Sequence, residues 1–158
     1  MADMVADLAC ILKHANVEHK VVCVGHDWGS QVCWEAARMR PDLIGAVSGV
    51  VTPYISAAGP FLPIESLVTM LPTLSYQMFF EKDTQNAIAE LNSDIRRSLR
   101  GTFRSASSPP PAHFLLANDT FMGAWNNVEV IPPIPFMSSE EEDYLVEQFS
   151  IQGFDNSE

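Results

Sequence analysis

Residues 20–39 read KVVCVGHDWGSQVCWEAARM, and this stretch decides the fold. Its opening, residues 20–25, is an almost continuous apolar run rich in β-branched side chains, which predicts a parallel strand buried on both faces. The following segment predicts a helix from Trp28 to about residue 38 or 39. Arg40-Pro41 closes it, because the residue before a proline disfavours helical geometry.

A second apolar run follows this helix. Residues 43–51, LIGAVSGVV, predict the next strand, so strand, helix and strand form one βαβ unit. Ahead of the first strand, apolar positions recur at helical spacing over residues 3–15, and Asn16 stands where a left-handed carboxy-cap is expected. These elements predict an α/β class for residues 1–53.

The character of the chain changes after Pro53. Prolines interrupt residues 54–75, and a short aromatic-rich piece follows them. Apolar residues three or four apart then predict one long helix over residues 84–103. We therefore expect two parts, a partial α/β core over residues 1–53 and a mostly helical region over residues 54–158.

The last third of the chain is the least regular. Residues 105–137 contain proline-rich breakers and show no periodicity from which an element can be predicted. The final helix is expected to begin near Ser138 or Ser139, with a glutamate three residues later completing a capping box. Gly153 is expected to end it, with Phe154 folding back on the last turn.

Composition narrows the class of protein. The chain has 158 residues, 47% of them hydrophobic and 18% charged, with a net charge of −11. Such acidity argues against a nucleic-acid partner. Part of it lies in residues 140–143, EEED, which we interpret as a helix amino terminus. No apolar stretch reaches the roughly 18 residues of a membrane helix, and the amino terminus lacks the basic cluster of a secretory signal, so we expect no membrane partner and a cytoplasmic location.

The cysteine and histidine patterns point away from disulfides and metals. Three cysteines without a CxxC spacing argue against a disulfide framework and favour a reducing compartment. Of these, Cys23 is expected to pack as a small hydrophobe. The histidines match no ligand spacing, so no metal is predicted; they are His14, His19, His26 and His113.

The pentad Gly25-His26-Asp27-Trp28-Gly29 is the sharpest motif of the sequence. It follows a predicted strand and opens a predicted helix, which is the context of a nucleophile elbow with the pattern G-x-nucleophile-x-G. Small residues are expected around the nucleophile because the turn is tight and neighbouring backbone approaches closely. The alternative for Asp27 is a plain helix N-cap, since aspartate is among the best caps.

An aspartate at this position predicts a particular chemistry. A carboxylate is ionised at neutral pH and can displace a leaving group from saturated carbon, giving an alkyl ester on Asp27. Water activated by a base must then hydrolyse the ester, and the backbone N–H of Trp28 is placed to stabilise the oxyanion. His26 is not the expected base, because neighbouring residues of a strand point in opposite directions.

Residues 21–54 resemble the α/β-hydrolase superfamily, in particular its epoxide hydrolases and haloalkane dehalogenases, which share elbows of the GHDWG type. Residues 75–81, SYQMFFE, resemble the lid of soluble-type epoxide hydrolases. In that family a tyrosine before a glutamine hydrogen-bonds the epoxide oxygen, which implies this role for Tyr76 and places Gln77 at the substrate together with Trp28. The alternative for Tyr76 is an ordinary aromatic of the lid core.

The resemblance implies a partial α/β-hydrolase core with a nucleophile elbow, followed by a helical cap. It implies conversion of a small hydrophobic epoxide to a vicinal diol, with no cofactor. Several family parts have no counterpart in the sequence, namely the His-Gly-x-Pro loop, the second lid tyrosine, and the base histidine with its acid. His113 falls within lid-like sequence, so we expect it to be structural.

Two other functions stay open on the sequence alone. A dehalogenase would use the same aspartate but would need no proton donor for the departing halide. A chain that only binds a ligand or a partner subunit would form the ester once without turning it over. Release of halide, or labelling of Asp27 without diol formation, separates these alternatives.

Overall fold

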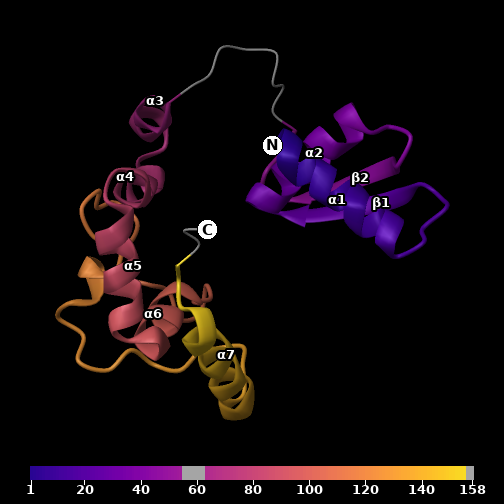
Figure 1. Cartoon of the computed structure of the whole chain (residues 1–158). Helices are drawn as coiled ribbons and strands as arrows, with labels where there is room; N and C mark the ends of the chain where they lie inside the picture. The colour runs from indigo at the N-terminus through magenta and orange to yellow at the C-terminus, as the bar shows by residue number, and fades with distance from the viewer. Residues whose placement is uncertain (55–62, 156–158) are drawn as a thin grey trace. The chain divides into compact units, whose positions relative to one another are not determined.

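The computed structural model describes residues 1–54 and 63–155. The chain divides into two compact units, Met1–Pro60 (unit 1) and Phe61–Glu158 (unit 2), each with its own elements (Figure 1). The boundary expected after Pro53, and the assignment of core and cap to the two parts, stay predictions.

Unit 1 is a βαβ unit preceded by a helix. Its elements are α1 (Ala2–His14), β1 (Val21–His26), α2 (Trp28–Met39) and β2 (Ile44–Val50). The strands pair in parallel, from Val21 opposite Ile44 to His26 opposite Val50. The predicted helices and strands of residues 1–53 are thus confirmed, and Asn16 has the expected positive φ, 53°.

One face of this two-stranded sheet carries the core of unit 1. Val5 of α1, Ala36 of α2 and Ile44 of β2 are buried together there. On the other face Val22 and Val24 are 64% and 69% exposed. The strand β1 was predicted to be buried on both faces. Among the residues that the structure describes, burial is found on one face of the sheet, because α1 and α2 contribute to the same cluster.

Unit 2 is helical, as predicted, but its elements are shorter and more numerous than expected. The described elements are α3 (Ile64–Met70), the 3₁₀ turn η1 (Pro72–Leu74), α4 (Ser75–Lys82), α5 (Thr84–Ser93), α6 (Ile95–Thr102), the 3₁₀ turn η2 (Gly123–Trp125) and α7 (Ser139–Gln152). Helix α3 was not anticipated from the proline-interrupted segment. An aromatic-rich core joins α4, α5 and the irregular stretch, and its buried members are Phe79, Ala87, Leu91, Phe114, Phe121, Met122, Trp125 and Ile131.

The single helix predicted over residues 84–103 is wrong. The chain breaks at Asp94, whose φ of −153° and ψ of 92° are extended. Its carboxylate accepts a hydrogen bond from the N–H of Arg97 and so caps α6. The apolar spacing continues across the break, which is why periodicity alone did not reveal it.

Arginines of α6 hold the irregular stretch 105–137 in place. The guanidinium of Arg97 donates to the carbonyl oxygens of Trp125 and Val128, both at 2.7 Å. Arg104, just past the helix, donates to the carbonyl of Pro132 at 2.9 Å. These bonds satisfy backbone acceptors in a segment that has almost no secondary structure of its own.

Helix α7 begins and ends as predicted. Ser138 and Glu141 form a reciprocal capping box, Gly153 ends the helix with φ 71°, and the Phe154 ring packs on Phe149 with ring centroids 5.0 Å apart. Glu142, within the acidic run, is only 3% exposed. The guanidiniums of Arg96 and Arg100 lie 2.7 Å from its carboxylate and link α6 to α7.

Candidate active site

Asp27 lies between the end of β1 and the first residue of α2, as the elbow motif predicts. Its backbone adopts φ 52° and ψ −121°, a positive-φ conformation that residues with a Cβ avoid. Such a conformation costs about 1–3 kcal/mol and persists only where the surroundings impose it. Strained residues of this kind concentrate at functional sites, so the backbone marks Asp27 as a candidate independently of its side chain.

Hydrogen bonds fix the two ends of the elbow. The N–H of Asp27 donates to the carbonyl of Val50 at 3.0 Å, and the N–H of Ser30 donates to the carbonyl of Asp27 at 2.9 Å. The hydroxyl oxygen of Ser30, which is fully buried, lies 2.7 Å from the carbonyl oxygen of Gly25 and 3.0 Å from that of Val50. Ser30 therefore ties the start of α2 to the ends of both strands.

The glycines of the pentad differ in what they do. A Cβ on Gly25 would overlap the backbone of Gly29, so the close approach of these two backbone segments excludes any side chain at Gly25. A Cβ on Gly29 would meet no heavy atom within 4 Å among the described residues. The expected need for a small residue thus has a visible cause at Gly25 alone.

The carboxylate of Asp27 does not serve the helix. Asp27 occupies the N-cap position of α2, but its side chain makes no capping hydrogen bond. A plain capping role, the alternative that the sequence left open, is therefore not what the side chain performs. The N–H of Trp28, at the first position of α2, has no intrahelical acceptor and favours negative charge beside it.

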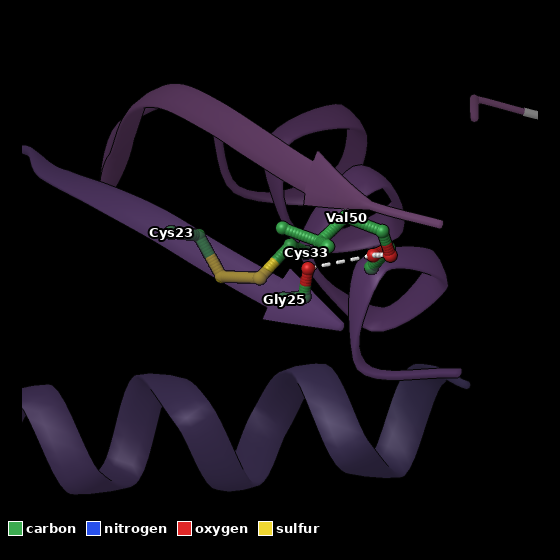
Figure 2. Close-up of a disulfide and its surroundings, with 5 residues drawn as sticks. Cys23, Gly25, Cys33 and Val50 are labelled. Carbon is green, nitrogen blue, oxygen red and sulfur yellow. Dashed lines mark hydrogen bonds between the residues drawn. A yellow bond between two sulfur atoms is a disulfide. The ribbon is translucent and has the colours of Figure 1, made fainter. Parts of the chain in front are cut away.

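A disulfide crosses the elbow, which corrects the expectation drawn from the cysteine count. Cys23 of β1 is bonded to Cys33 of α2, with their Cα atoms 5.5 Å apart (Figure 2). Cysteine spacing carries no information about the distance between a strand and the helix that follows it, so the pairing could not be read from the sequence. Cys23 also contacts the core of unit 1, and Cys10 is exposed with a free thiol.

Tyr76 and Gln77 lie at the start of α4 in unit 2. The ring of Tyr76 packs edge-on against Phe80 and Phe121, each with centroids 5.6 Å away. Its hydroxyl oxygen accepts a hydrogen bond from the Gln77 amide at 3.2 Å. The ring thus packs with the aromatic core, as the alternative interpretation expected, while the phenolic proton is not used in this contact.

The predicted site residues are divided between the two units. Asp27 and Trp28 belong to unit 1, and Tyr76 and Gln77 to unit 2. Trp28 is exposed. The structure describes each pair within its own unit.

The other titratable residues form no evident metal centre. No three His, Cys, Asp or Glu side chains gather in a way that could hold a metal ion in residues 1–54 and 63–155. The side chains of His14, His19, His26 and His113 are all exposed. No helix in the described part of the chain is long and apolar enough to cross a membrane.

Sequence reasoning missed two residues that shape the elbow, Ser30 and Cys33. Both lie on the side of α2 that faces the strands, one helical turn apart. A surface hollow of about 500 Å³ was not anticipated either. It is lined by Phe136, Met137, Glu140, Glu141, Tyr144 and Leu145, and so contains none of the predicted site residues.

The chain is similar to known proteins. A family model described as "alpha/beta hydrolase fold" matches residues 1–139. The chain is 28% identical over 138 residues to "Bifunctional epoxide hydrolase 2" of Rattus norvegicus, covering 85% of this chain and 24% of that protein. It is 28% identical over 156 residues to "Epoxide hydrolase A" of Mycobacterium tuberculosis, covering 96% of this chain and 47% of that protein.

A solved structure gives the same result. The crystal structure of epoxide hydrolase A from Mycobacterium thermoresistibile superimposes with a TM-score of 0.68 at 28% identity, covering 93% of this chain and 46% of that one. The chain therefore spans between about a quarter and about half the length of these relatives.

Proposed function

Because the chain belongs to the alpha/beta hydrolase fold family, we propose that it acts as an epoxide hydrolase, which adds water to a small hydrophobic epoxide to give a vicinal diol. The names of its bacterial and mammalian relatives support this substrate class. The observation that carries the proposal is the elbow itself. It holds Asp27 at positive φ with a carboxylate that caps nothing.

In the first step the Asp27 carboxylate attacks an epoxide carbon. The bond from that carbon to the epoxide oxygen breaks, an ester forms on Asp27, and the released oxygen takes a proton from the hydroxyl of Tyr76. The hydrogen bond from Gln77 to the Tyr76 oxygen supports this role, because it orients the hydroxyl and occupies its acceptor side. Trp28 and Gln77 contact the substrate in this proposal.

In the second step water attacks the carbonyl carbon of the ester. The negative charge that develops on the carboxyl oxygen lies at the amino terminus of α2, where the N–H of Trp28 stabilises it. Collapse of this intermediate releases the diol and restores the carboxylate. Of the two protons of the attacking water, one goes to the departing diol oxygen and the other restores the Tyr76 hydroxyl. Neither His26 nor His113 is the base of this step in the proposal.

The proton donor separates this proposal from dehalogenation. An alkoxide is a poor leaving group that needs a proton, whereas a halide leaves without one. The half-buried phenol of Tyr76 beside Gln77 supports the epoxide reaction. Unit 2 is the cap in this proposal, and unit 1 is the part of the core that carries the nucleophile.

Replacement of the nucleophile tests the proposal. We expect the substitution Asp27→Asn, introduced into the native full-length protein, to lower the rate of diol formation by roughly three orders of magnitude or more, because an amide does not form the ester. Asp83→Asn is the matched control, since Asp83 also stands at a helix N-cap without a capping bond but is exposed in unit 2. Full activity in Asp27→Asn, or equal losses in both variants, would remove Asp27 from the reaction.

The location remains part of the proposal. We place the protein in the cytoplasm, where glutathione and thioredoxin keep most thiols reduced. The Cys23–Cys33 bond then lies in a compartment that can break it.

A further inference from the structure

The Cys23–Cys33 disulfide encloses the whole nucleophile elbow. Its two cysteines are 10 residues apart, and Asp27 lies between them. Cys23 stands in β1 two residues before Gly25, and Cys33 stands in α2 one turn beyond Ser30. Figure 2 shows the bond running from the strand to the helix beside Gly25 and Val50.

Two ties therefore fasten the first half of α2 to the strands. One is the Ser30 hydroxyl, which contacts the carbonyls of Gly25 and Val50. The other is covalent, through Cys33. Both matter for Asp27, because a residue with a Cβ holds a positive φ only while its surroundings leave it no other conformation.

We propose, on the basis of the proposed function, that the Cys23–Cys33 pair is a redox-sensitive positioning device. The oxidised pair holds Asp27 in its reactive conformation. Reduction loosens α2 from β1 and slows attack of Asp27 on the substrate. The non-covalent tie at Ser30 remains in the reduced form, so the effect is a change of rate with the fold of unit 1 retained.

A dithiol supplies the electrons for the switch. Its thiolate attacks the sulfur of Cys23, the S–S bond breaks, and Cys33 leaves as a thiolate that takes up a proton. The second thiol of the reductant then displaces Cys23 and becomes part of a cyclic disulfide. Two electrons and two protons pass to the protein. Cys23 is the expected point of attack because it is half-buried, whereas Cys33 is only 4% exposed.

The test compares the oxidised and the dithiothreitol-reduced forms of the native full-length protein. Intact mass after alkylation with iodoacetamide counts the free thiols and so fixes the redox state. Rapid quenching at saturating epoxide then gives the rate at which the ester appears on the Asp27 peptide. We expect reduction to slow ester formation by about tenfold or more, since small displacements of a reacting group cost rate steeply.

Variants separate this pair from other thiols. The double variant Cys23→Ala, Cys33→Ala should form the ester slowly and should not respond to dithiothreitol. Cys10→Ala, which removes the exposed free thiol of α1, should keep the full response. A response that persists in the double variant, or disappears in Cys10→Ala, would overturn the proposal.

Hydrogen exchange provides a readout that does not depend on activity. On reduction, amides of residues 24–32 should exchange faster while those of α1 stay unchanged. If Asp27 forms no ester in either redox state, the proposed function fails. The comparison of hydrogen exchange between the two redox forms then decides the redox proposal by itself. Equal exchange at the elbow in both forms, with reduction verified by mass, would overturn it.

Discussion

Asp27 combines a backbone of positive φ with a carboxylate that does not cap its helix. A plain N-cap residue has extended geometry and gives its carboxylate to the helix, as Asp94 does. Asp27 does neither. Two helix starts in one chain thus use the same residue type for different purposes.

Tyr76 permits a sharp test of the proton donor. Tyr76→Phe removes one oxygen and keeps the ring that packs on Phe80 and Phe121. We therefore expect epoxide opening to slow by roughly a hundredfold with little change in thermal stability. Tyr144→Phe is the control, because Tyr144 is an exposed tyrosine of the same unit. Equal rates in the wild type and Tyr76→Phe would favour the dehalogenase chemistry, in which no donor is required.

The sequence predicted Asp27 because its evidence is local. The elbow pattern, the strand before it and the helix after it all lie within about twenty residues of the chain. The Cys23–Cys33 bond and the double contact of the Ser30 hydroxyl depend on how β1, α2 and β2 meet in space. No spacing rule along the chain encodes those distances, so both were found in the structure alone.

At the scale of elements, the break between α5 and α6 depends on one side chain. Asp94→Ala removes the acceptor for the Arg97 N–H and should lower the free energy of unfolding by about 1 kcal/mol. Asp83→Ala should cost less, because Asp83 starts α5 without a capping bond. Denaturant titration of both variants measures the difference. Equal losses would mean that the cap does not set the break.

The junction of α6 and α7 predicts a pH dependence. Burial raises the pKa of the Glu142 carboxyl, but hydrogen bonds from the Ile134 N–H and from Arg96 and Arg100 outweigh it, so that its pKa lies below the ordinary 4.5. A lowered pKa in the folded state means that these contacts stabilise the protein above pH 4.5. The stabilisation is lost as the pH falls below that value through the folded pKa.

Unfolding experiments from neutral pH down into the acid range can measure this loss. Glu142→Gln should be less stable than the wild type at neutral pH, and the two should converge in acid. Glu147→Gln, an exposed position on the same helix, should follow the wild type throughout. If Glu142→Gln and the wild type lose stability in parallel, the carboxylate contributes nothing that depends on its charge.

Periodicity predicted the elements of unit 1 and the ends of α7, because strong apolar patterns and caps lie within single segments. It failed where the side chain of one residue overrides the pattern, as at Asp94. It also gave no element for residues 105–137, since their conformation rests on arginines such as Arg97 of α6 and Arg104 just beyond it. Long-range side-chain bonds of this kind have no periodic trace.

At the scale of the whole molecule, chemistry is assigned to both units. The proposed nucleophile belongs to unit 1 and the proposed donor to unit 2. The α/β class predicted for residues 1–53 and the helical character of the described residues beyond them agree with the family match over residues 1–139. The proposed reaction therefore requires a contribution from each unit.

The most direct test of that reaction traces the oxygen atoms. In the proposed mechanism the oxygen added to the epoxide comes from Asp27, and water replaces it in the carboxylate. With the native protein in excess over an epoxide in H₂¹⁸O, a single turnover should place heavy oxygen in the peptide that contains Asp27 and leave the new diol unlabelled. Heavy oxygen in the first diol, with an unlabelled Asp27 peptide, would mean that water attacks the epoxide directly and that Asp27 is not the nucleophile.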